Sequence, residues 1–584
     1  MLNLKVKKND EYFDLDLKSD TKISFSMNSG IWEFEQITGS YSLPFQLPLS
    51  AKNNSILEFP NNLNIEKNKT FETYVYINGI LFKKGILTIE SADINFVEVS
   101  VLVGISSIYE NKDTKIETLD IFGGDIEWTW KNEYDPSIDF FCLPEIIDLN
   151  FLKDTFFEGR ELNINQYSSV FEKYLAEIVI DAGGYSEYAY PIVPHPQLRY
   201  ILVCLLNYLG FDIKTNHFDQ EKYDNLCIMN LNDACYKEYD YSLDAFFHEL
   251  ETYNIKNHLP DISVGEFLRA IHAIFAIDFK ISGNDIEILH IGDYIDTTEY
   301  IDITTKVSKQ KSTIYITPID CLELNWETHP DAKNSITQLL SELSEDYFLV
   351  NGAPPPGTFV PGTTCWIDLQ LTDQPFYIPH FRIWGNKLDS GNIIYEWNDL
   401  YEIKNENFQY THNQQNYFSS SYFISQNKLS ISLGIAPFTC YYDGSPLVYT
   451  PEIDQPGNSW LNYTKKRSYS MRLAFYNGFN DNDIPIISHI GENFKMELWS
   501  INGLYYTFWE KIIRYIQSVE YEQEQYIFLT LKELIYFDFS KKYKIGNELF
   551  FVKSLDFSID INGNVSASKA ILMPANSGYT ENES

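Results

Sequence analysis

The sequence predicts a β-rich α+β fold, with several small β-barrel or sandwich domains and a helix–strand middle region. Two observations on its 584 residues lead to this prediction. Aromatic residues make up 16% of the chain, and aromatic and β-branched side chains favour strands. Hydrophobic residues make up 44%, which is enough for true cores, whereas helical periodicity is confined to a few segments. A chain of this length divides into roughly three to four domains.

We expect four domains along the chain. The first, residues 1–125, is a β-domain with a proline-rich arm, and the second, 126–300, is an α+β region with a helix–strand repeat. Residues 301–470 read as an irregular β-domain with a Pro/Gly loop. Residues 471–584 read as a C-terminal β-domain with one amphipathic helix and a frayed tail.

The strands of the first domain carry the clearest local signals. Valines alternate with other residues from Val97 to Val103, so one face of this strand is expected to be buried. Asn78-Gly79 stands between two further strand-like runs and is a strong hairpin signal.

The stretch from Gly39 to Asn61 combines apolar side chains with three prolines, which remove backbone donors and exclude a helix at those points. We expect a rigid arm here, strand-like from Tyr41 to Phe45 and turning around Lys52 to Ser55. Its apolar side chains would contact its own β-domain or a neighbouring subunit. The candidate interface residues are Tyr41, Leu43, Phe45 and Leu47.

The middle of the chain contains an internal repeat. The stretch from Pro194 to Lys214 aligns without gaps with the stretch from Pro260 to Lys280. In both copies apolar residues recur at i, i+3, i+4 and i+7, which predicts an amphipathic helix that runs into a short strand. Ser263 and Glu266 have the spacing of a capping box at the start of the second helix.

The last segment predicts one helix and a hairpin. Seven apolar side chains between Leu504 and Ile516 share one helical face. Beyond them, apolar residues alternate with polar ones from Leu555 to Ile561, and Asn562-Gly563 is a good hairpin turn.

Charge and cysteine usage exclude several functions. The formal net charge of −38 should repel nucleic-acid phosphates, so groove or strand binding is a poor hypothesis. The same charge serves solubility, or a surface that DNA passes without adhering. The seven cysteines are scattered, without a CxxC pair, and suggest neither a disulfide framework nor a zinc site. No apolar run is long enough to span a bilayer, and the opening residues lack the apolar core of a signal peptide.

The sequence nominates no catalytic, cofactor-binding or metal-binding residue, so we expect a protein that is not an enzyme. His248-Glu249 begins like a zinc-protease helix, but Thr252 stands where the second histidine is needed. Asp481 and Asp483 could hold calcium, but solvated turn residues are the better explanation. The loop that starts at Asp560 lacks the closing calcium ligand and is better explained as a hairpin turn.

Several segments, taken in order, resemble tail proteins from phages and prophages of Bacteroidetes-type bacteria. They are "GSYSLPFQLPLSAKNN", "VYINGILFKKGILTI", "NHLPDISVGEFLRAIHAIFAIDFKISGNDIEI", "GLYYTFWEKIIRYI" and "KYKIGNELFFVKSLDFSI". The resemblance runs from about residue 20 to residue 570, with little contribution from 305 to 465. It implies a tail-tip or baseplate hub protein, similar to the central hub of contractile-tailed phages.

The resemblance carries expectations about assembly. Such hubs are homotrimers, and two barrel-like domains per subunit make a pseudo-sixfold ring that seats on the hexameric tail tube. The other end presents a spike or fibre, and the bore conducts DNA during genome ejection. The expected partners are therefore further copies of the chain, the tail tube protein and other baseplate subunits, with DNA only in transit. The protein would be made in the host bacterial cytoplasm and reside in the virion.

Two alternatives remain open from the sequence. Aromatic β-domains with Asn/Asp loops also suit a glycan-binding receptor protein or a glycosidase of the tail tip. A distal tail ring protein, which would be hexameric, is the other alternative.

Overall fold

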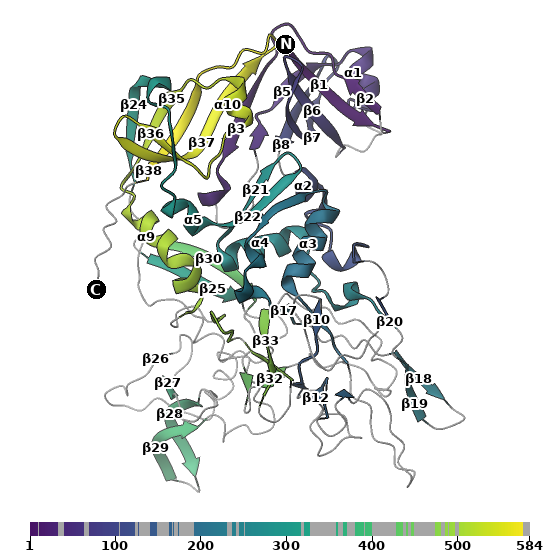
Figure 1. Cartoon of the computed structure of the whole chain (residues 1–584), viewed down its shortest axis with the longest axis vertical. Helices are drawn as coiled ribbons and strands as arrows, with labels where there is room; N and C mark the ends of the chain where they lie inside the picture. The colour runs from purple at the N-terminus through teal and green to yellow at the C-terminus, as the bar shows by residue number, and fades with distance from the viewer. Residues whose placement is uncertain are drawn as a thin grey trace.

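The computed structural model describes most of both ends of the chain and shorter segments of its middle (Figure 1). The described residues are 1–9, 11–32, 40–62, 69–103, 106–122, 126–127, 140–148, 163–165, 167–168, 173–174, 192–229, 236–240, 245–249, 252–316, 321–327, 358–359, 366–370, 380–389, 392–399, 428–435, 440–441, 445–448, 473–480, 485–488, 490–496 and 502–575. Most of the predicted 301–470 domain, with its Pro/Gly loop, and the predicted tail after residue 575 therefore lie outside the described residues.

The described chain is β-rich, with large antiparallel sheets and few helices. Its main feature is one sheet of fourteen described strands, in two halves. The N-terminal half consists of β1 (Leu2–Lys8), β2 (Glu11–Asp14), β3 (Lys22–Asn28), β4 (Ser40–Ser42), β5 (Phe45–Pro48), β6 (Thr70–Ile77), β7 (Ile80–Ala92) and β8 (Phe96–Val103). The C-terminal half consists of β23 (Tyr300–Asp302), β24 (Val307–Tyr315), β35 (Tyr521–Ile527), β36 (Lys542–Ile545), β37 (Glu548–Asp560) and β38 (Ser568–Pro574).

The two halves join where β3 pairs with β37. The pairing is antiparallel and runs without a break from Lys22 opposite Asp560 to Asn28 opposite Ser554. The strand path is β2-β1-β6-β7-β8-β4-β3-β37-β38-β35-β24, so within the described residues it is open, with β2 and β24 at its ends. Of the two architectures that the sequence led us to expect, barrel or sandwich, these strands do not form a closed barrel.

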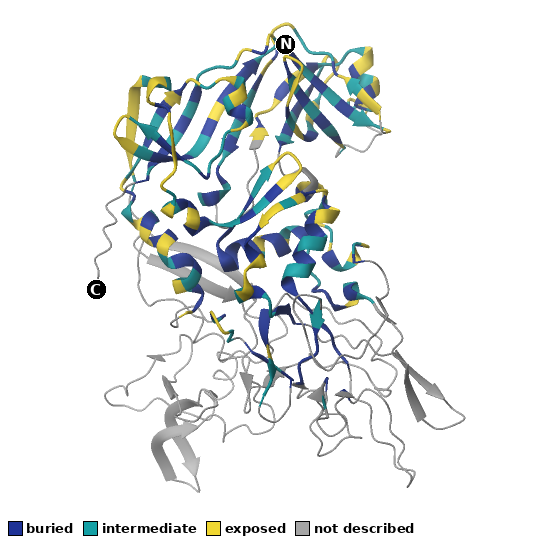
Figure 2. Ribbon diagram, in the orientation of Figure 1, coloured by how far each residue is buried: buried dark blue, intermediate teal, exposed yellow. Residues whose placement is uncertain are grey.

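One apolar core fills both halves and crosses the seam between them. Phe25 of β3 stacks on Phe557 of β37, with ring centroids 5.6 Å apart, and Phe82 of β7 packs edge-on against both rings. Figure 2 shows buried residues alternating with more exposed ones along the strands of both halves. This alternation is what strands with one covered face require. The halves therefore share an interior and are not merely in contact.

The local predictions for the N-terminal half are confirmed. Val97, Val99 and Val101 are fully buried, and β8 pairs with β7 along its whole length. Asn78 and Gly79 form the two-residue turn between β6 and β7, both with positive φ, at +52° and +79°. Positive φ at both central residues is the geometry that makes Asn-Gly favourable in such a turn.

The proline-rich stretch is part of the large sheet and not a separate arm, and a helix replaces its predicted turn. Its residues form β4, which pairs with β3 and β8, and β5, which pairs with β8. Pro44 lies between the two strands, where its missing donor breaks no ladder hydrogen bond. In place of the predicted turn stands the short helix α1 (Ala51–Ile56), which begins because the Ser50 hydroxyl accepts the backbone N–H of Asn53.

Below the large sheet lies a helical layer with a small sheet of its own (Figure 1). Its elements are α3 (Leu198–Tyr208), α4 (Val264–Phe275), β16 (Asp212–Asn216), β21 (Ile277–Ser282), β22 (Asp285–His290) and α5 (Ile291–Asp296). β22 lies between β16, which is parallel to it, and β21, which is antiparallel. Each predicted helix is present and is followed by a strand of this sheet.

The two helices of the repeat match in their first two turns and then differ. The aligned apolar residues from Leu198 to Leu205 and from Val264 to Ile271 are buried, as the stripe predicts. The next aligned pair differs, since Tyr208 is half exposed and Ile274 is buried. The Ser263–Glu266 capping box is present. His272 of the second helix is buried, and its Nδ1 contacts the Ile277 carbonyl oxygen.

The predicted C-terminal helix begins with a π-helical turn. Residues Tyr505–Trp509 form this turn, and α9 (Glu510–Ser518) continues from it. Phe508 and Trp509 are buried, as predicted for the apolar face. The short helix α10 (Leu531–Ile535) follows in the C-terminal half and starts with a capping box of Thr530 and Glu533.

The remaining described elements are short or lie apart from the large sheet. The strands are β9 (Ile126–Glu127), β10 (Phe141–Cys142), β11 (Ile146–Asp148), β12 (Asn163–Ile164), β13 (Tyr167–Ser168), β14 (Lys173–Tyr174), β15 (His195–Pro196), β17 (Leu226–Ile228), β18 (Tyr236–Asp240), β19 (Ala245–Glu249), β20 (Thr252–Tyr253), β25 (Cys321–Glu327), β26 (Thr358–Phe359), β27 (Trp366–Gln370), β28 (His380–Asp389), β29 (Asn392–Asp399), β30 (Lys428–Ile435), β31 (Cys440–Tyr441), β32 (Ser445–Val448), β33 (Leu473–Phe479) and β34 (Pro485–Ser488). The helix α2 (Ser106–Asn111) leads from the N-terminal half into the helical layer.

Candidate site at the domain junction

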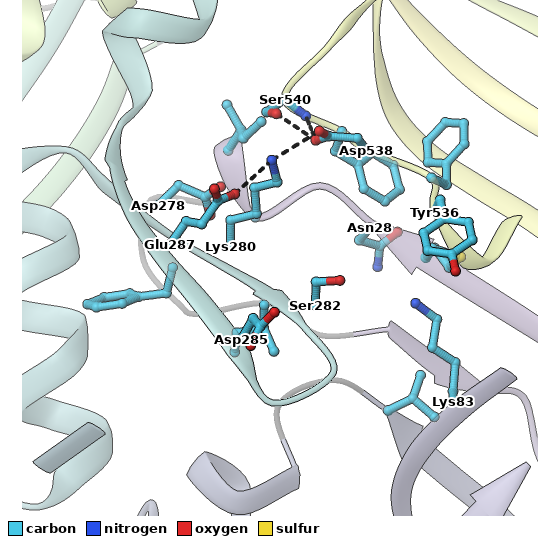
Figure 3. Close-up of a pocket in the computed structure, with 18 of the residues that line it drawn as sticks. Asn28, Lys83, Asp278, Lys280, Ser282, Asp285, Glu287, Tyr536, Asp538 and Ser540 are labelled. Atoms are coloured by element: carbon cyan, nitrogen blue, oxygen red, sulfur yellow. Dashed lines mark hydrogen bonds and ion pairs between the residues drawn. The ribbon is translucent and has the colours of Figure 1, made fainter. Parts of the chain in front are cut away.

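A cavity of about 420 Å³ lies where the two halves of the large sheet meet the helical layer. The N-terminal half contributes the end of β3 and Lys83 of β7, and the helical layer contributes the β21–β22 hairpin. The C-terminal half contributes residues 535–540, which link α10 to β36. Figure 3 shows these three groups of side chains facing one another. The cavity is therefore formed by tertiary structure and not by any one element.

Lys280 of β21 is the central charge of this junction. Its Nζ lies 3.0 Å from Glu287 Oε2, on the neighbouring strand β22, and 3.0 Å from Asp538 Oδ2, in the C-terminal half (Figure 3). Burial works to lower the pKa of Lys280, but its hydrogen bonds with the two carboxylates outweigh this, and the pKa lies above its ordinary value. Lys280 therefore remains charged and ties the helical layer to the C-terminal half.

Asp538 is held in place from two sides. Its Oδ1 accepts hydrogen bonds from the Ser540 backbone N–H at 2.9 Å and from the Ser540 hydroxyl at 2.5 Å. Burial opposes ionisation, but the hydrogen bonds from Ser540 and Lys280 outweigh it, so the pKa of Asp538 lies below its ordinary value. The carboxylate is thus ionised and oriented toward Lys280.

Asp278, two residues before Lys280 on β21, behaves differently. Its Oδ2 accepts a hydrogen bond from the Tyr294 hydroxyl at 3.0 Å. Burial raises the pKa of Asp278 to about 6, because this hydrogen bond and the charge of Lys280 compensate for only part of the lost hydration. This carboxyl group therefore changes its charge within a mildly acidic range.

Lys83 is the contribution of the N-terminal half. Its side chain extends into the cavity toward Asn28 and Tyr536 in Figure 3. Burial lowers its pKa. In contrast to Lys280, it has no carboxylate within ion-pair distance among the residues that the structure describes. Ion pairing at this cavity thus joins the helical layer to the C-terminal half of the sheet and not to the N-terminal half.

The described carboxylates around Lys280 are engaged in ion pairs and hydrogen bonds, and the pair with Asp538 ties the helical layer to the C-terminal half. Sequence reasoning missed this site because Lys280 and Asp538 are 258 residues apart and neither belongs to a motif. The only available signal was that Lys280 ends the second copy of the repeat.

The four candidate interface residues divide into two pairs. Phe45 and Leu47 are 7% and 0% exposed and lie in the core of the N-terminal half. Tyr41 and Leu43 are 39% and 51% exposed. The structure therefore uses the first pair inside the domain and presents the second pair on the surface, where their interface role stays a prediction. The alternation of Phe45 and Leu47 with exposed Gln46 is the signal that separates core from surface.

The other residues that the sequence singled out have structural explanations or lie outside the described residues. Asp560 Oδ1 accepts the backbone N–H groups of Asn562 and Asn564, and its Oδ2 accepts the Asn564 side-chain amide, within the turn between β37 and β38. Asp481 and Asp483 lie outside the described residues.

Comparisons with known proteins find similar solved structures, two of which are described here, but no family. No family model matches the chain, and no curated protein matches it. The 43 kDa tail protein of prophage MuSo2 from Shewanella oneidensis is similar over 98% of this chain and 99% of its own, with 9% identity and a TM-score of 0.32. The tail protein from Neisseria meningitidis MC58 is similar over 98% of this chain and 96% of its own, with 6% identity and a TM-score of 0.31. Within the described ranges, each helix is too short or too polar to cross a membrane.

Proposed function

We propose that this protein is a structural component of a phage tail, and specifically a hub of the tail tip or baseplate. In this role it joins the tail tube to the spike or fibre and forms part of the path for DNA. The observation that carries the proposal is the pair of β-structured halves joined through β3 and β37 above a helical layer. The sequence resemblance implies two barrel-like domains side by side in a hub subunit, and the two open halves of the sheet share this side-by-side placement.

The charge of the chain supports the DNA path. With a net charge of −38, a channel wall made of this protein would repel phosphates and let DNA slide without adhering. The junction supports a structural and non-catalytic role, because the ion pair of Lys280 with Asp538 fixes the C-terminal half against the helical layer. We further propose a homotrimer with the tail tube protein and other baseplate subunits as partners, located in the virion.

The proposal is tested by measuring whether this chain is present in intact phage particles, and at which position in the tail. Tails are purified from cells that produce the phage, analysed by mass spectrometry and imaged by electron cryomicroscopy. The hub role predicts this chain at the tail tip with three copies. Six copies in a ring would favour the distal tail ring protein, and absence of the chain from the tail would refute a tail role.

Surface variants test the interface part of the proposal. Replacing both Tyr41 and Leu43 with Ser is expected to lower incorporation into tails while the chain still folds, because both side chains are exposed. Ile94→Ser is the matched control, since Ile94 is also an apolar side chain of the N-terminal half and is 86% exposed. If the wild type, the double variant and Ile94→Ser were incorporated equally, Tyr41 and Leu43 would not be interface residues.

A further inference from the structure

Two buried cysteines from distant parts of the chain lie in contact beneath the helical layer. Cys142 ends β10 and Cys227 lies at the centre of β17, 85 residues further along the chain. Their Sγ atoms are 3.3 Å apart, and the two side chains are 2% and 0% exposed. Figure 1 places β10 and β17 together below α3. The fold therefore brings together two thiols that share no sequence motif.

Strand pairing sets the positions of both thiols. Cys142 lies opposite His195 in the antiparallel β10–β15 ladder. Cys227 lies opposite Ala474 of β33, and it also forms a bridge with the residue that follows β15. Tyr476 of β33 packs with the two cysteines in one buried cluster. The thiols are thus held in contact by the backbone pairing of short strands from distant stretches of the chain.

The geometry suits a disulfide. A disulfide joins its two sulfur atoms at about 2.05 Å, so these sulfur atoms would approach each other by about 1.3 Å. Their contacts with backbone carbonyl oxygens are long, at 3.8 Å from Cys142 Sγ to His195 and 3.6 Å from Cys227 Sγ to Asn225. Because a thiol is a weak donor, losing these two contacts on oxidation costs little. In the described part of the chain no group of three His, Cys, Asp or Glu side chains is placed to hold a metal ion, so the pair does not belong to such a group there.

We propose that Cys142 and Cys227 form a redox site, in which a small peroxide converts the two thiols into a disulfide that links β10 to β17. The inference goes beyond the proposed function, since it concerns an oxidation of the chain itself and holds whichever assembly contains the chain. Thiols stay reduced in a cytosol, and disulfides persist in oxidising surroundings. The reduced pair is therefore the form expected during synthesis, and the disulfide is the form expected outside a reducing compartment.

The oxidation takes two steps. One thiolate attacks an oxygen of hydrogen peroxide, so that an S–O bond forms, the O–O bond breaks, and the displaced hydroxide takes up a proton and leaves as water. The second thiolate attacks the sulfenic sulfur, so that the S–S bond forms, the S–O bond breaks, and a second water leaves with the remaining proton. The two sulfur atoms lose two electrons and the peroxide gains them. Two thiols and one peroxide thus become one disulfide and two waters.

The surroundings of Cys142 determine how fast this reaction runs. Burial and the adjacent Cys227 thiol raise the pKa of Cys142. The other titratable groups that face the pair stay neutral, because burial raises the pKa values of Tyr174 and Tyr476 and lowers the pKa of His195 to about 3. Because the thiolate is the nucleophile, oxidation should be slow at neutral pH and faster at alkaline pH.

The disulfide would constrain a long part of the middle region. The two cysteines enclose α3 and β16, and they are 85 residues apart. A crosslink that closes a long loop removes conformational freedom from the opened chain, so the closed state gains stability relative to it. The oxidised protein should therefore open less often between β10 and β17 and resist proteases in this region.

The experiment compares the reduced and oxidised forms of the full chain. Protein purified with a reductant is freed of it, treated with hydrogen peroxide at neutral and alkaline pH, denatured and alkylated. Mass spectrometry is expected to find two of the seven thiols protected, the loss of two hydrogen atoms, and a peptide that links Cys142 to Cys227. Limited proteolysis between the two cysteines is expected to slow by about tenfold or more on oxidation, and dithiothreitol should reverse this.

Single-cysteine variants are the controls. Cys142→Ala and Cys227→Ala should each lose the linked peptide, and peroxide should no longer protect them from proteolysis. Cys204→Ala, at a half-buried cysteine of α3, should behave like the wild type. Circular dichroism and thermal melting verify that each variant is folded. The comparison of reduced with oxidised wild type uses no substitution, so it holds even where a variant does not fold.

Three results would overturn the inference. One is a wild type in which both thiols remain alkylatable after long treatment at alkaline pH, which would make the pair a packing contact only. Another is a linked peptide that joins either cysteine to a different partner. The third is an oxidised chain that is cleaved as fast as the reduced one. Because the measurements use the purified chain, each of these results leaves the proposed tail role untouched, and absence of the chain from tails leaves the redox site untouched.

Discussion

The two halves of the large sheet are both β-structured, but their strands are distributed differently along the chain. The N-terminal half is formed by one continuous stretch, from β1 to the end of β8 at Val103. The C-terminal half combines β23 and β24, which end at Tyr315, with strands that start at Tyr521. Contacts between residues close in sequence cost less loop-closure entropy than contacts across a long insertion. The C-terminal half therefore depends on the rest of the fold to bring its parts together.

The halves also differ in how they hold the helical layer. Asp538 of the C-terminal half forms an ion pair with Lys280, whereas Lys83 of the N-terminal half enters the same cavity without one among the described residues. The N-terminal half is therefore formed from one continuous stretch without an ion pair to the helical layer among the described residues, whereas the C-terminal half is assembled from distant strands and is coupled by charge to that layer. The following predictions test this difference, beginning with the largest expected effect.

Phe557→Ala should remove the aromatic contact that joins the halves. Phe557 is buried and packs on Phe25 and Phe82, so its loss should lower the free energy of unfolding by about 3–5 kcal/mol. Urea unfolding followed by tryptophan fluorescence and circular dichroism measures this. Tyr536→Ala, at a residue that is 73% exposed, is the control. A stable N-terminal half that unfolds separately with an unchanged midpoint would show that the shared core does not couple the halves.

Asp278→Asn should change the pH dependence of stability. The folded pKa of Asp278 is about 6, above the ordinary 3.8, so between these values the folded state binds more protons than the unfolded state. Stability from this group is fully present below about pH 4 and is lost as the pH rises through about 6. Relative to the wild type, the variant should gain up to about 3 kcal/mol on going from pH 4 to pH 7.

The measurement is urea unfolding at several pH values. The Asn carbonyl can still accept the hydrogen bond from Tyr294, so the substitution removes charge without removing the contact. Asp285→Asn, on the same hairpin but in an exposed ion pair with Lys214, is the control. If stability depended on pH in the same way in the wild type and in Asp278→Asn, the raised pKa of Asp278 would be contradicted.

Gly85→Ala should damage the N-terminal half specifically. A Cβ at Gly85 would lie 2.2 Å from the Leu102 backbone oxygen, within the β7–β8 ladder, where the backbone has little room to shift. We expect a loss of about 1–3 kcal/mol. Gly546→Ala in the C-terminal half meets no atom within 4 Å and carries only the strain of a positive φ, about 1 kcal/mol. Thermal melting measures the stability of both variants. An equal loss of stability would contradict the explanation that the Cβ at position 85 clashes with the Leu102 oxygen.

The smallest expected effect concerns the helix caps, of which each half has one. Ser50 caps α1 and also donates to Asp16 Oδ2 at 2.6 Å, while Thr530 caps α10 within a capping box. Ser50→Ala and Thr530→Ala should each cost about 1 kcal/mol. Hydrogen exchange at the first turn of each helix measures the loss, and Ser50→Thr and Thr530→Ser are the conservative controls. If exchange is unchanged in both alanine variants, the caps do not determine the stability of these turns.

Much of the local structure could be predicted because its causes are local. The buried face of Val97 to Val103, the Asn78-Gly79 turn and the Ser263–Glu266 capping box each depend on residues within one turn or strand. The proline-rich stretch was harder, because its strands are formed by pairing with β3 and β8, and nothing within the stretch specifies those partners. The start of the C-terminal helix as a π-helical turn also had no signal in its apolar stripe.

By itself, the sequence determined the apolar faces of its periodic strands and helices, the Asn78-Gly79 turn and the Ser263–Glu266 cap. Side-chain periodicity, turn geometry and capping act over a few residues, so they can be recognised in the chain before it folds. Only the tertiary structure decided that β3 pairs with β37 and that Lys280 meets Asp538. These pairings depend on the free energy of the whole arrangement, in which burial and loop-closure entropy select partners hundreds of residues apart.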